Sequence, residues 1–199
     1  MKLAVMTPEI FFNKEAEALN LLFAEGLHLL HLRKPYSNEF QMVQLLDAIS
    51  KDFHQYIVLH DHFELAERFS VKGIHLNSRN NVAPVGFRES LSRSCHAIEE
   101  LSQYSKFDYL FLSPIFNSIS KSRYQAAFSE KELEKARRNG IINERIFALG
   151  GINAENILQA KKWGFGGAVI LGALWKYFDE NKDMQNLLKH FIKLKEVSI

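Results

Sequence analysis

Cysteine is nearly absent from this 199-residue chain, in which Cys95 is the single example. One cysteine excludes an intramolecular disulfide and any thiolate metal cluster, which fits the reducing cytoplasm as the expected location. Long apolar runs are absent too, because none approaches the roughly 18 residues that a membrane-spanning helix needs. The apolar stretch at the N-terminus is interrupted by Pro8 and Glu9. We therefore expect neither a signal peptide nor a membrane span.

An excess of charge of one sign is also lacking. Lysine and arginine number 25 against 23 aspartates and glutamates, and the basic residues are scattered. Because a nucleic-acid binder normally carries a basic patch, we expect a small-molecule partner and no nucleic acid. Hydrophobic residues at 47% and charged residues at 24% are typical of a folded globular protein. Without a linker or low-complexity tract, residues 1–199 are expected to form one domain.

Short apolar runs alternate with longer amphipathic stretches along the chain. The runs predicted as strands are residues 2–6, 27–32, 56–60, 73–76, 90–95, 108–112, 145–149 and 166–171. Apolar residues at helical spacing predict helices at residues 15–23, 40–49, 63–69, 96–104, 129–138, 153–162 and 182–195, with a short one at about 84–89. Asn153 is the expected N-cap of its helix.

Strand and helix units that alternate in this way indicate a parallel sheet covered by helices, because parallel strands need crossovers and bury both faces. An open, doubly wound sheet often carries a glycine-rich fingerprint after its first strand, but here no glycine precedes Gly26. Eight predicted strands therefore favour an α/β fold of the closed kind, a single (β/α)8 TIM barrel with a closed parallel sheet.

In such a barrel the functional residues lie at the carboxyl ends of the strands. The polar residues predicted at these ends are His31 and Arg33, His60 and Asp61, Asn80, Ser94 and His96, and Lys121 in the loop after the sixth strand. Strand alternation places His31 and Arg33 on one face. The loop at residues 113–129 is the longest irregular segment, and we expect it to cover the mouth of the barrel.

Glycines follow the last two predicted strands. Gly150 and Gly151 come directly after the seventh strand, and Gly172 follows the eighth. Glycine lets a ligand approach backbone N–H groups closely, and barrels of this type commonly hold phosphate after strands seven and eight. These residues are therefore predicted to bind a phosphate group.

Two clusters have simpler interpretations than their chemistry suggests. Cys95 and His96 are neighbours on a strand and point to opposite faces, so Cys95 is expected to be a buried, inert thiol. His60, Asp61 and His62 offer one carboxylate and no helical ligand spacing. Zinc is therefore not expected there.

Seven motifs in their order along the chain resemble the thiamine phosphate synthase and TenI family. They are HLRKP at 31–35, LHDHFELA at 59–66, GIHLNSRN at 73–80, SCH at 94–96, DYLFLSPIF and SISK within 108–121, ALGGI at 148–152 and ILGAL at 170–174. The resemblance implies a transferase of thiamine biosynthesis. In that reaction hydroxymethylpyrimidine diphosphate loses diphosphate to Mg²⁺, and the nitrogen of a thiazole phosphate captures the resulting cation.

The resemblance also implies roles for individual residues. The catalytic positions would be Arg33 and Lys121, which hold the diphosphate, together with Ser94 and His31. The substrate-binding positions would be His60, Asn80, His96, Gly150, Gly151, Leu171 and Gly172, with the glycines on the thiazole phosphate. Asp61 would bind Mg²⁺, the expected cofactor. The expected partners are the two small phosphorylated substrates, and a homo-oligomer is left open.

The chain departs from the family pattern around the implied metal site. The family's asparagine is His60, and its second metal-binding aspartate aligns with Asn80. Its first-motif lysine falls on Pro35, with Lys34 one place early. Only Asp61 is left as an anionic ligand, so Mg²⁺ is expected to bind weakly and mainly through diphosphate oxygens.

Two alternatives to the synthase follow from the same residues. The TenI branch, a thiazole tautomerase, shares the His-Leu-Arg that begins at His31 but carries a histidine where this chain has Pro114. In a tautomerase His31 or His96 would be the acid-base group. A non-catalytic relative that binds a phosphorylated ligand is the other alternative, since fold resemblance alone does not separate the three.

Overall fold

The computed structural model describes residues 1–117, 125–176, 178 and 183–198. Within these residues eight parallel strands form a closed barrel in chain order. They are β1 (Lys2–Met6), β2 (Leu30–Leu32), β3 (Ile57–Leu59), β4 (Gly73–Leu76), β5 (Ser90–Cys95), β6 (Tyr109–Leu112), β7 (Ile146–Leu149) and β8 (Gly167–Ile170). The barrel closes where β1 pairs with β8, with Lys2 opposite Gly167. The predicted (β/α)8 TIM barrel is confirmed.

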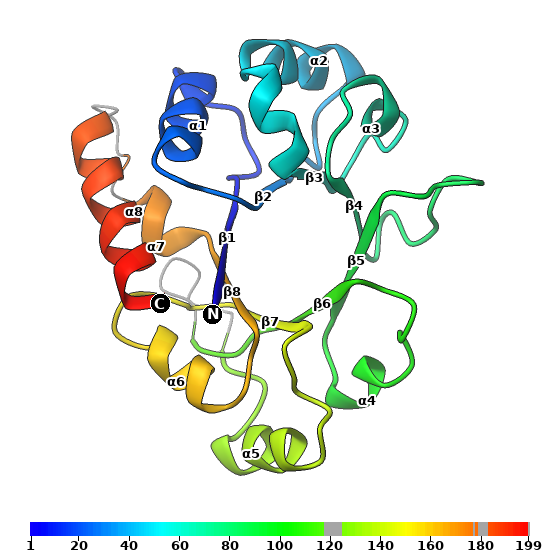
Figure 1. Cartoon of the computed structure of the whole chain (residues 1–199), viewed down its shortest axis with the longest axis vertical. Helices are drawn as coiled ribbons and strands as arrows, with labels where there is room; N and C mark the ends of the chain where they lie inside the picture. The colour runs from blue at the N-terminus through cyan, green and yellow to red at the C-terminus, as the bar shows by residue number, and fades with distance from the viewer. Residues whose placement is uncertain (118–124, 177, 179–182, 199) are drawn as a thin grey trace.

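Helices surround the barrel, as Figure 1 shows. They are α1 (Glu15–Ala24), α2 (Glu39–Ala48), α3 (Leu65–Arg68), α4 (Ile98–Leu101), α5 (Glu130–Arg138), α6 (Ile157–Lys162), α7 (Gly172–Trp175) and α8 (Met184–Ser198), with a 3₁₀ helix, η1 (Lys51–Tyr56), before β3. Reciprocal capping boxes begin α2 at Asn38 and α5 at Ser129. Each box satisfies backbone N–H groups that the first helical turn leaves without partners. None of the helices in the described residues is long and apolar enough to cross a lipid bilayer.

One local prediction was wrong. Residues 77–89, all of which the structure describes, hold no helix, and in Figure 1 a loop lies between β4 and β5. The expected helix at 84–89 contains Pro84, which lacks an N–H donor, and Gly86, which has φ +81°. The helix α6 itself begins at Ile157. Asn153 caps the turn that leads into it, because its Oδ1 accepts from the N–H groups of residues 155 and 156 and its own N–H donates to the Asn156 side chain.

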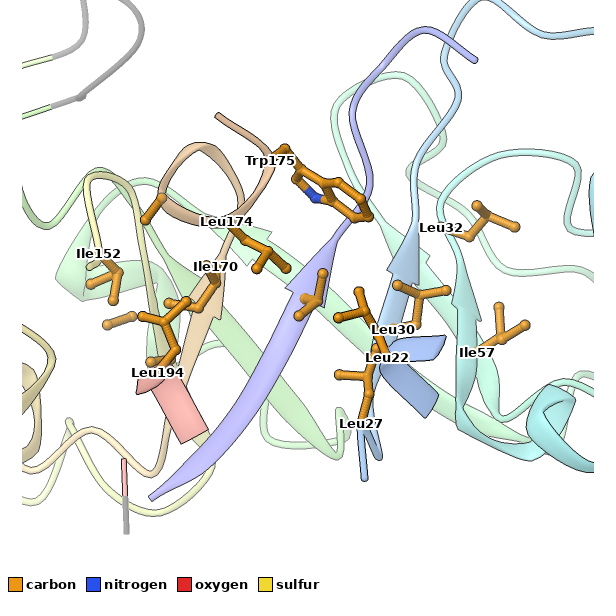
Figure 2. Packing of buried hydrophobic residues seen from close by; sticks show 14 of the residues in the cluster. Leu22, Leu27, Leu30, Leu32, Ile57, Ile152, Ile170, Leu174, Trp175 and Leu194 are labelled. Carbon is orange, nitrogen blue, oxygen red and sulfur yellow. The ribbon is translucent and has the colours of Figure 1, made fainter. Parts of the chain in front are cut away.

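Alternation along the strands separates two apolar layers. Outward side chains pack under the helices, and Figure 2 shows Leu30 in this cluster with Leu22, and Ile170 with Leu174. Inward side chains fill the barrel: Ala4, Met6, Val58, Tyr109, Phe111, Phe147 and Val169. Full burial of one such large apolar side chain stabilises the fold by about 1.5–3 kcal/mol. Near the amino end, Gly167 is required because a Cβ there would lie 2.3 Å from the Phe147 ring.

Candidate functional site

A cavity of about 540 Å³ lies at the carboxyl ends of the strands. Residues from distant parts of the sequence line it together, because the closed barrel brings all the strand ends to one mouth. The lining residues that the sequence had predicted are Arg33, His60, Ser94, His96, Gly150, Gly151, Leu171 and Gly172. Most of the predicted site is therefore one contiguous surface.

The other predicted residues lie elsewhere. His31 is fully buried inside the barrel, and Asp61 and Asn80 are beside the cavity rather than in its lining. Lys121 lies outside the described residues, as does the middle of the loop at 113–129. The described start of that loop does reach the mouth, since Pro114 lines the cavity.

Sequence reasoning missed Glu9, which faces Arg33 across the mouth. The Arg33 Nη1 atom lies 2.8 Å from Glu9 Oε1. Thr7, at the end of β1, fixes the backbone of Arg33, because its Oγ1 accepts from the Arg33 N–H at 2.9 Å and donates to the Arg33 carbonyl at 3.2 Å. Glu9 is a polar residue after a strand end, so its position in the sequence was the available signal.

Histidines from three neighbouring strands meet in the barrel interior. His31 Nδ1 lies 2.8 Å from His60 Nε2, and His31 Nε2 lies 2.9 Å from the Tyr109 hydroxyl. His75 sits between Ser92 and Ser94, with both hydroxyls 2.8 Å from its ring nitrogens. Every bond in the first chain can reverse when the tautomers reverse. A hydrogen-bonded path therefore runs from Tyr109 through His31 to His60.

Burial keeps these imidazoles neutral. Desolvation lowers the pKa of His31 from 6.5 to about 3. Desolvation and neighbouring histidines and arginines lower the pKa values of His60 and His75 well below 6.5. A neutral imidazole donates from one nitrogen and accepts at the other, which the path to His60 requires. His60 lines the cavity, and no hydrogen bond from another described residue reaches its Nδ1.

The same three histidines are a candidate metal cluster, since their ligand atoms lie within 4.8 Å of one another. Their geometry favours hydrogen bonding instead. The His60 and His75 rings are stacked, with centroids 4.2 Å apart and planes inclined by 19°. Their lone pairs therefore lie in nearly parallel planes and do not converge on one ion. The short His31–His60 contact, at 2.8 Å, holds a proton between the two nitrogens.

The surroundings of Asp61 do not fit a magnesium ion held by protein groups alone. Asp61 Oδ2 accepts from the Lys34 N–H at 3.1 Å, and Oδ1 accepts from the Asn80 amide at 3.1 Å. Among the described residues, no group of three or more potential metal ligands includes Asp61. Mg²⁺ prefers octahedral oxygen ligands at about 2.0–2.1 Å, often with several waters. The assistance of magnesium stays a prediction.

Lys34, one place before the family's lysine position, has a structural role. Its Nζ lies 2.6 Å from Glu15 Oε1 and donates to the carbonyls of Pro8 and Ile10. The Lys34 side chain is fully buried, and Nζ also lies 4.7 Å from the centre of the Phe11 ring. Burial lowers the pKa of Lys34 and raises that of Glu15, and each partner opposes the shift of the other. Lys34 therefore holds the β1–α1 connection and does not reach the cavity lining.

The glycine pair after β7 is required by its own neighbours. Gly150 and Gly151 have φ values of +100° and +65°. A Cβ on Gly151 would lie 2.3 Å from the Asn117 carbonyl oxygen, and one on Gly150 would lie 2.9 Å from Pro114. The Phe116 N–H also donates to the Gly150 carbonyl at 3.0 Å. The pair thus packs closely against the start of the loop after β6. Phosphate binding at these glycines stays a prediction.

The residues at the end of β5 divide as alternation predicts. His96 lines the cavity, and its Nδ1 lies 3.2 Å from the Ser113 carbonyl oxygen and 3.3 Å from the Ser113 hydroxyl. Glu100 accepts from the His96 backbone N–H at 2.7 Å. Cys95 is fully buried on the opposite side, and burial raises the pKa of its thiol to about 12. The burial expected for Cys95 is confirmed.

Comparison with known proteins identifies a family for this chain. Residues 3–174 match the thiamine monophosphate synthase family. The thiamine-phosphate synthase of Ruminiclostridium cellulolyticum is 24% identical over 186 residues, which cover 88% of this chain and 87% of that protein. A crystal structure of thiamine phosphate pyrophosphorylase from Bacteroides thetaiotaomicron is 41% identical, with a TM-score of 0.91 and coverage of 100% of this chain and 98% of that one. Thiamine phosphate pyrophosphorylase from Pyrococcus furiosus, 19% identical with a TM-score of 0.77 over 99% of this chain and 95% of that chain, shares the fold.

Proposed function

The chain belongs to the thiamine monophosphate synthase family, and from this premise we propose that it joins hydroxymethylpyrimidine diphosphate to thiazole phosphate with loss of diphosphate. The observation that carries the proposal is the composition of one cavity. Arg33 lines it after β2, and Gly150, Gly151 and Gly172 line it after β7 and β8. A single cavity therefore offers a guanidinium to one phosphorylated substrate and backbone groups to the other.

Departure of diphosphate needs positive charge near the leaving oxygens more than it needs a strong base. The Arg33 guanidinium presents N–H donors in a fork that matches phosphoryl oxygens. In the structure this fork contacts Glu9 at 2.8 Å. A diphosphate group replaces Glu9 as the partner of Arg33 when it binds, and Lys121 is proposed to contribute a second cation.

Ser94 is proposed to position the reacting substrates. Its hydroxyl lies 2.8 Å from His75 Nε2, and Ser94 also lines the cavity. The neutral ring of His75 orients the hydroxyl, so that its remaining hydrogen-bonding capacity points to a ligand. His60, His96 and Leu171 form further parts of the same lining and are proposed to contact the two substrates.

The proposal is tested by incubating the purified protein with both substrates, with and without Mg²⁺, and measuring thiamine phosphate by chromatography. We expect product with the wild type and a loss of roughly 100-fold in kcat/KM for Arg33→Gln, by analogy with removal of one charge-stabilising donor. The matched control is Arg138→Gln, an exposed arginine on α5. Absence of product from the wild type under every condition would overturn the proposal.

One observation favours a thiazole tautomerase as the second candidate. The path from Tyr109 through His31 to His60 can carry a proton to the edge of the cavity. A tautomerase needs such a transfer and no diphosphate site. The same preparation is therefore assayed for thiazole tautomerisation. If neither reaction proceeds but thiazole phosphate binds, the non-catalytic alternative replaces both.

A further inference from the structure

The loop after β4 presents an arginine at the mouth of the barrel. Asn77 Oδ1 accepts from the backbone N–H groups of Arg79 and Asn80 at 3.0 and 3.2 Å, and the Asn77 N–H donates to the Asn80 carbonyl at 2.9 Å. Asparagine commonly closes turns in this way. The Asn77 amide also donates to the His60 carbonyl at 3.2 Å. This hydrogen bond attaches the turn to the residue that follows β3 and fixes the orientation of the turn.

Asp61 forms an ion pair with this arginine. Arg79 Nη2 lies 3.5 Å from Asp61 Oδ1. The Asn80 amide donates to the same carboxylate and to the His60 carbonyl, at 3.1 and 3.0 Å. Because both neighbours of this amide are acceptors, its NH₂ group must face them. The position where the family has its second metal-binding aspartate therefore presents a donor to Asp61, and a cationic side chain completes the surroundings of the carboxylate.

The Arg79 guanidinium remains open to the cavity. Arg79 and Arg33 line the same space. The Arg79 side chain is 41% exposed, whereas that of Asp61 is 10% exposed. A guanidinium has five N–H donors, so one contact with Asp61 leaves several for a ligand. The two arginines present positive charge from the loops after β2 and β4 to the same cavity.

We propose that Arg79, oriented by Asp61, neutralises the diphosphate at this edge of the cavity, so that diphosphate binding by this protein does not depend on a divalent cation. The inference rests on the proposed function for the identity of the anion. Arg79 acts as a binding residue. Asp61 acts as a positioning residue, because its carboxylate holds the guanidinium toward the anion and does not itself ligate a metal.

The experiment titrates inorganic diphosphate into the full-length protein by calorimetry, once in EDTA and once with Mg²⁺. We expect saturable binding in EDTA and a weakening of roughly tenfold for Arg79→Gln, the loss of about one charge-assisted contact. Arg79→Lys should bind with intermediate affinity, because it keeps the charge without the fork. Asp61→Asn should weaken binding by a smaller factor than Arg79→Gln, since it frees the guanidinium without removing it.

Arg88→Gln is the control, because Arg88 lies in the same β4–β5 connection but faces the opposite end of the barrel. It should leave diphosphate affinity unchanged. Thermal unfolding of each variant checks that it is folded. Binding that is absent in EDTA and restored by Mg²⁺, or equal affinities for wild type and Arg79→Gln, would overturn the inference. Metal-free diphosphate binding without synthase activity would refute the proposed function alone, and synthase activity with strictly Mg²⁺-dependent binding would refute this inference alone.

Discussion

The imidazoles of His31 and His60 share a hydrogen bond of 2.8 Å between Nδ1 and Nε2, with His31 fully buried inside the barrel and His60 at the edge of the cavity. One proton lies between the two nitrogens, and a second proton on His31 would place a charge where burial disfavours it. Protonation of this pair is therefore expected to lower the stability of the barrel.

The pH dependence of stability should report this burial. The pKa of His31 is about 3 in the folded protein, against an ordinary value of 6.5. Between these values the unfolded chain binds a proton that the folded chain does not. The free energy of unfolding should therefore be highest above pH 6.5 and fall on acidification, with His31 contributing a slope of about 1.4 kcal/mol per pH unit.

Urea unfolding between pH 7 and pH 4 measures that slope. His31→Gln should reduce the slope by about 1.4 kcal/mol per pH unit, the contribution of one proton, whatever its effect on the stability at neutral pH. His28→Gln, which changes an exposed histidine, should leave the slope as in the wild type. An unchanged slope in His31→Gln would mean that His31 is protonated in the folded protein.

The ion pair between Lys34 and Glu15 should respond more to loss of one partner than to loss of both. Lys34→Met leaves a buried carboxylate whose Oε2 already has no hydrogen-bond partner among the described residues. We expect urea titrations to show a free energy of unfolding about 3–5 kcal/mol lower than that of the wild type. Adding Glu15→Leu should recover most of this loss. A double variant as unstable as Lys34→Met would show that the loss of stability comes from lost packing around Phe11 rather than from the unpaired carboxylate.

Gly151→Ala should disturb the mouth more than an equally strained substitution elsewhere. Gly151 and Gly140 have similar φ values of +65° and +72°, but a Cβ on Gly140 would meet nothing within 4 Å. Both alanine variants should lose about 1–2 kcal/mol to backbone strain. Gly151→Ala should lose more and weaken thiazole phosphate binding, because the new Cβ displaces the Asn117 carbonyl. Equal stability and equal affinity in the two variants would contradict this reading.

Glu9→Gln should strengthen diphosphate binding, because it removes the carboxylate that competes for Arg33. The partly exposed pair contributes at most about 1 kcal/mol, so a gain of up to about fivefold in affinity is expected at low salt. Calorimetry with inorganic diphosphate measures it. In an Arg33→Gln background the same Glu9 change should give no gain through this contact. An undiminished gain there would place the effect of Glu9 on another group.

Cys95 should remain unreactive in the native protein. Its thiol is fully buried, with a pKa raised to about 12, so little thiolate forms at pH 8. Iodoacetamide should modify one thiol per molecule in urea and almost none in buffer, as read by mass spectrometry. Rapid native modification would show that the space between β5 and α4 opens often.

Hydropathy periodicity was sufficient to predict the strands and their order. Most of the strands are short apolar runs that were visible locally, whereas β5 alternates Leu91 and Cys95 with serines and an arginine, and eight strands together implied closure. The bounds were less well predicted, since the strand expected at 27–32 is Leu30–Leu32. The helix expected at 84–89 failed because Pro84 and Gly86 break the backbone pattern, and its apolar residues Val85 and Phe87 lie two positions apart rather than three or four.

The motifs located the mouth of the barrel, because polar residues after strand ends are local features of the sequence. They did not assign the contacts. Lys34 and Arg33 are adjacent in the chain, yet one is buried against Glu15 and the other lines the cavity. Strand alternation permits this division, but the partners, Glu9 before α1 and Glu15 at its first position, come from another part of the chain.

Local patterns along the chain were enough to predict the alternation of strands and helices, the closed parallel barrel and most of the polar residues at its mouth. The hydrogen-bonded path through His31, His60 and Tyr109 and the contact of Arg79 with Asp61 could be found only in the folded protein. The two kinds of feature differ in the sequence distance over which they act. Strand periodicity acts over a few residues, whereas these partners come from different strands and loops, and their distances depend on the register of every pairing between them.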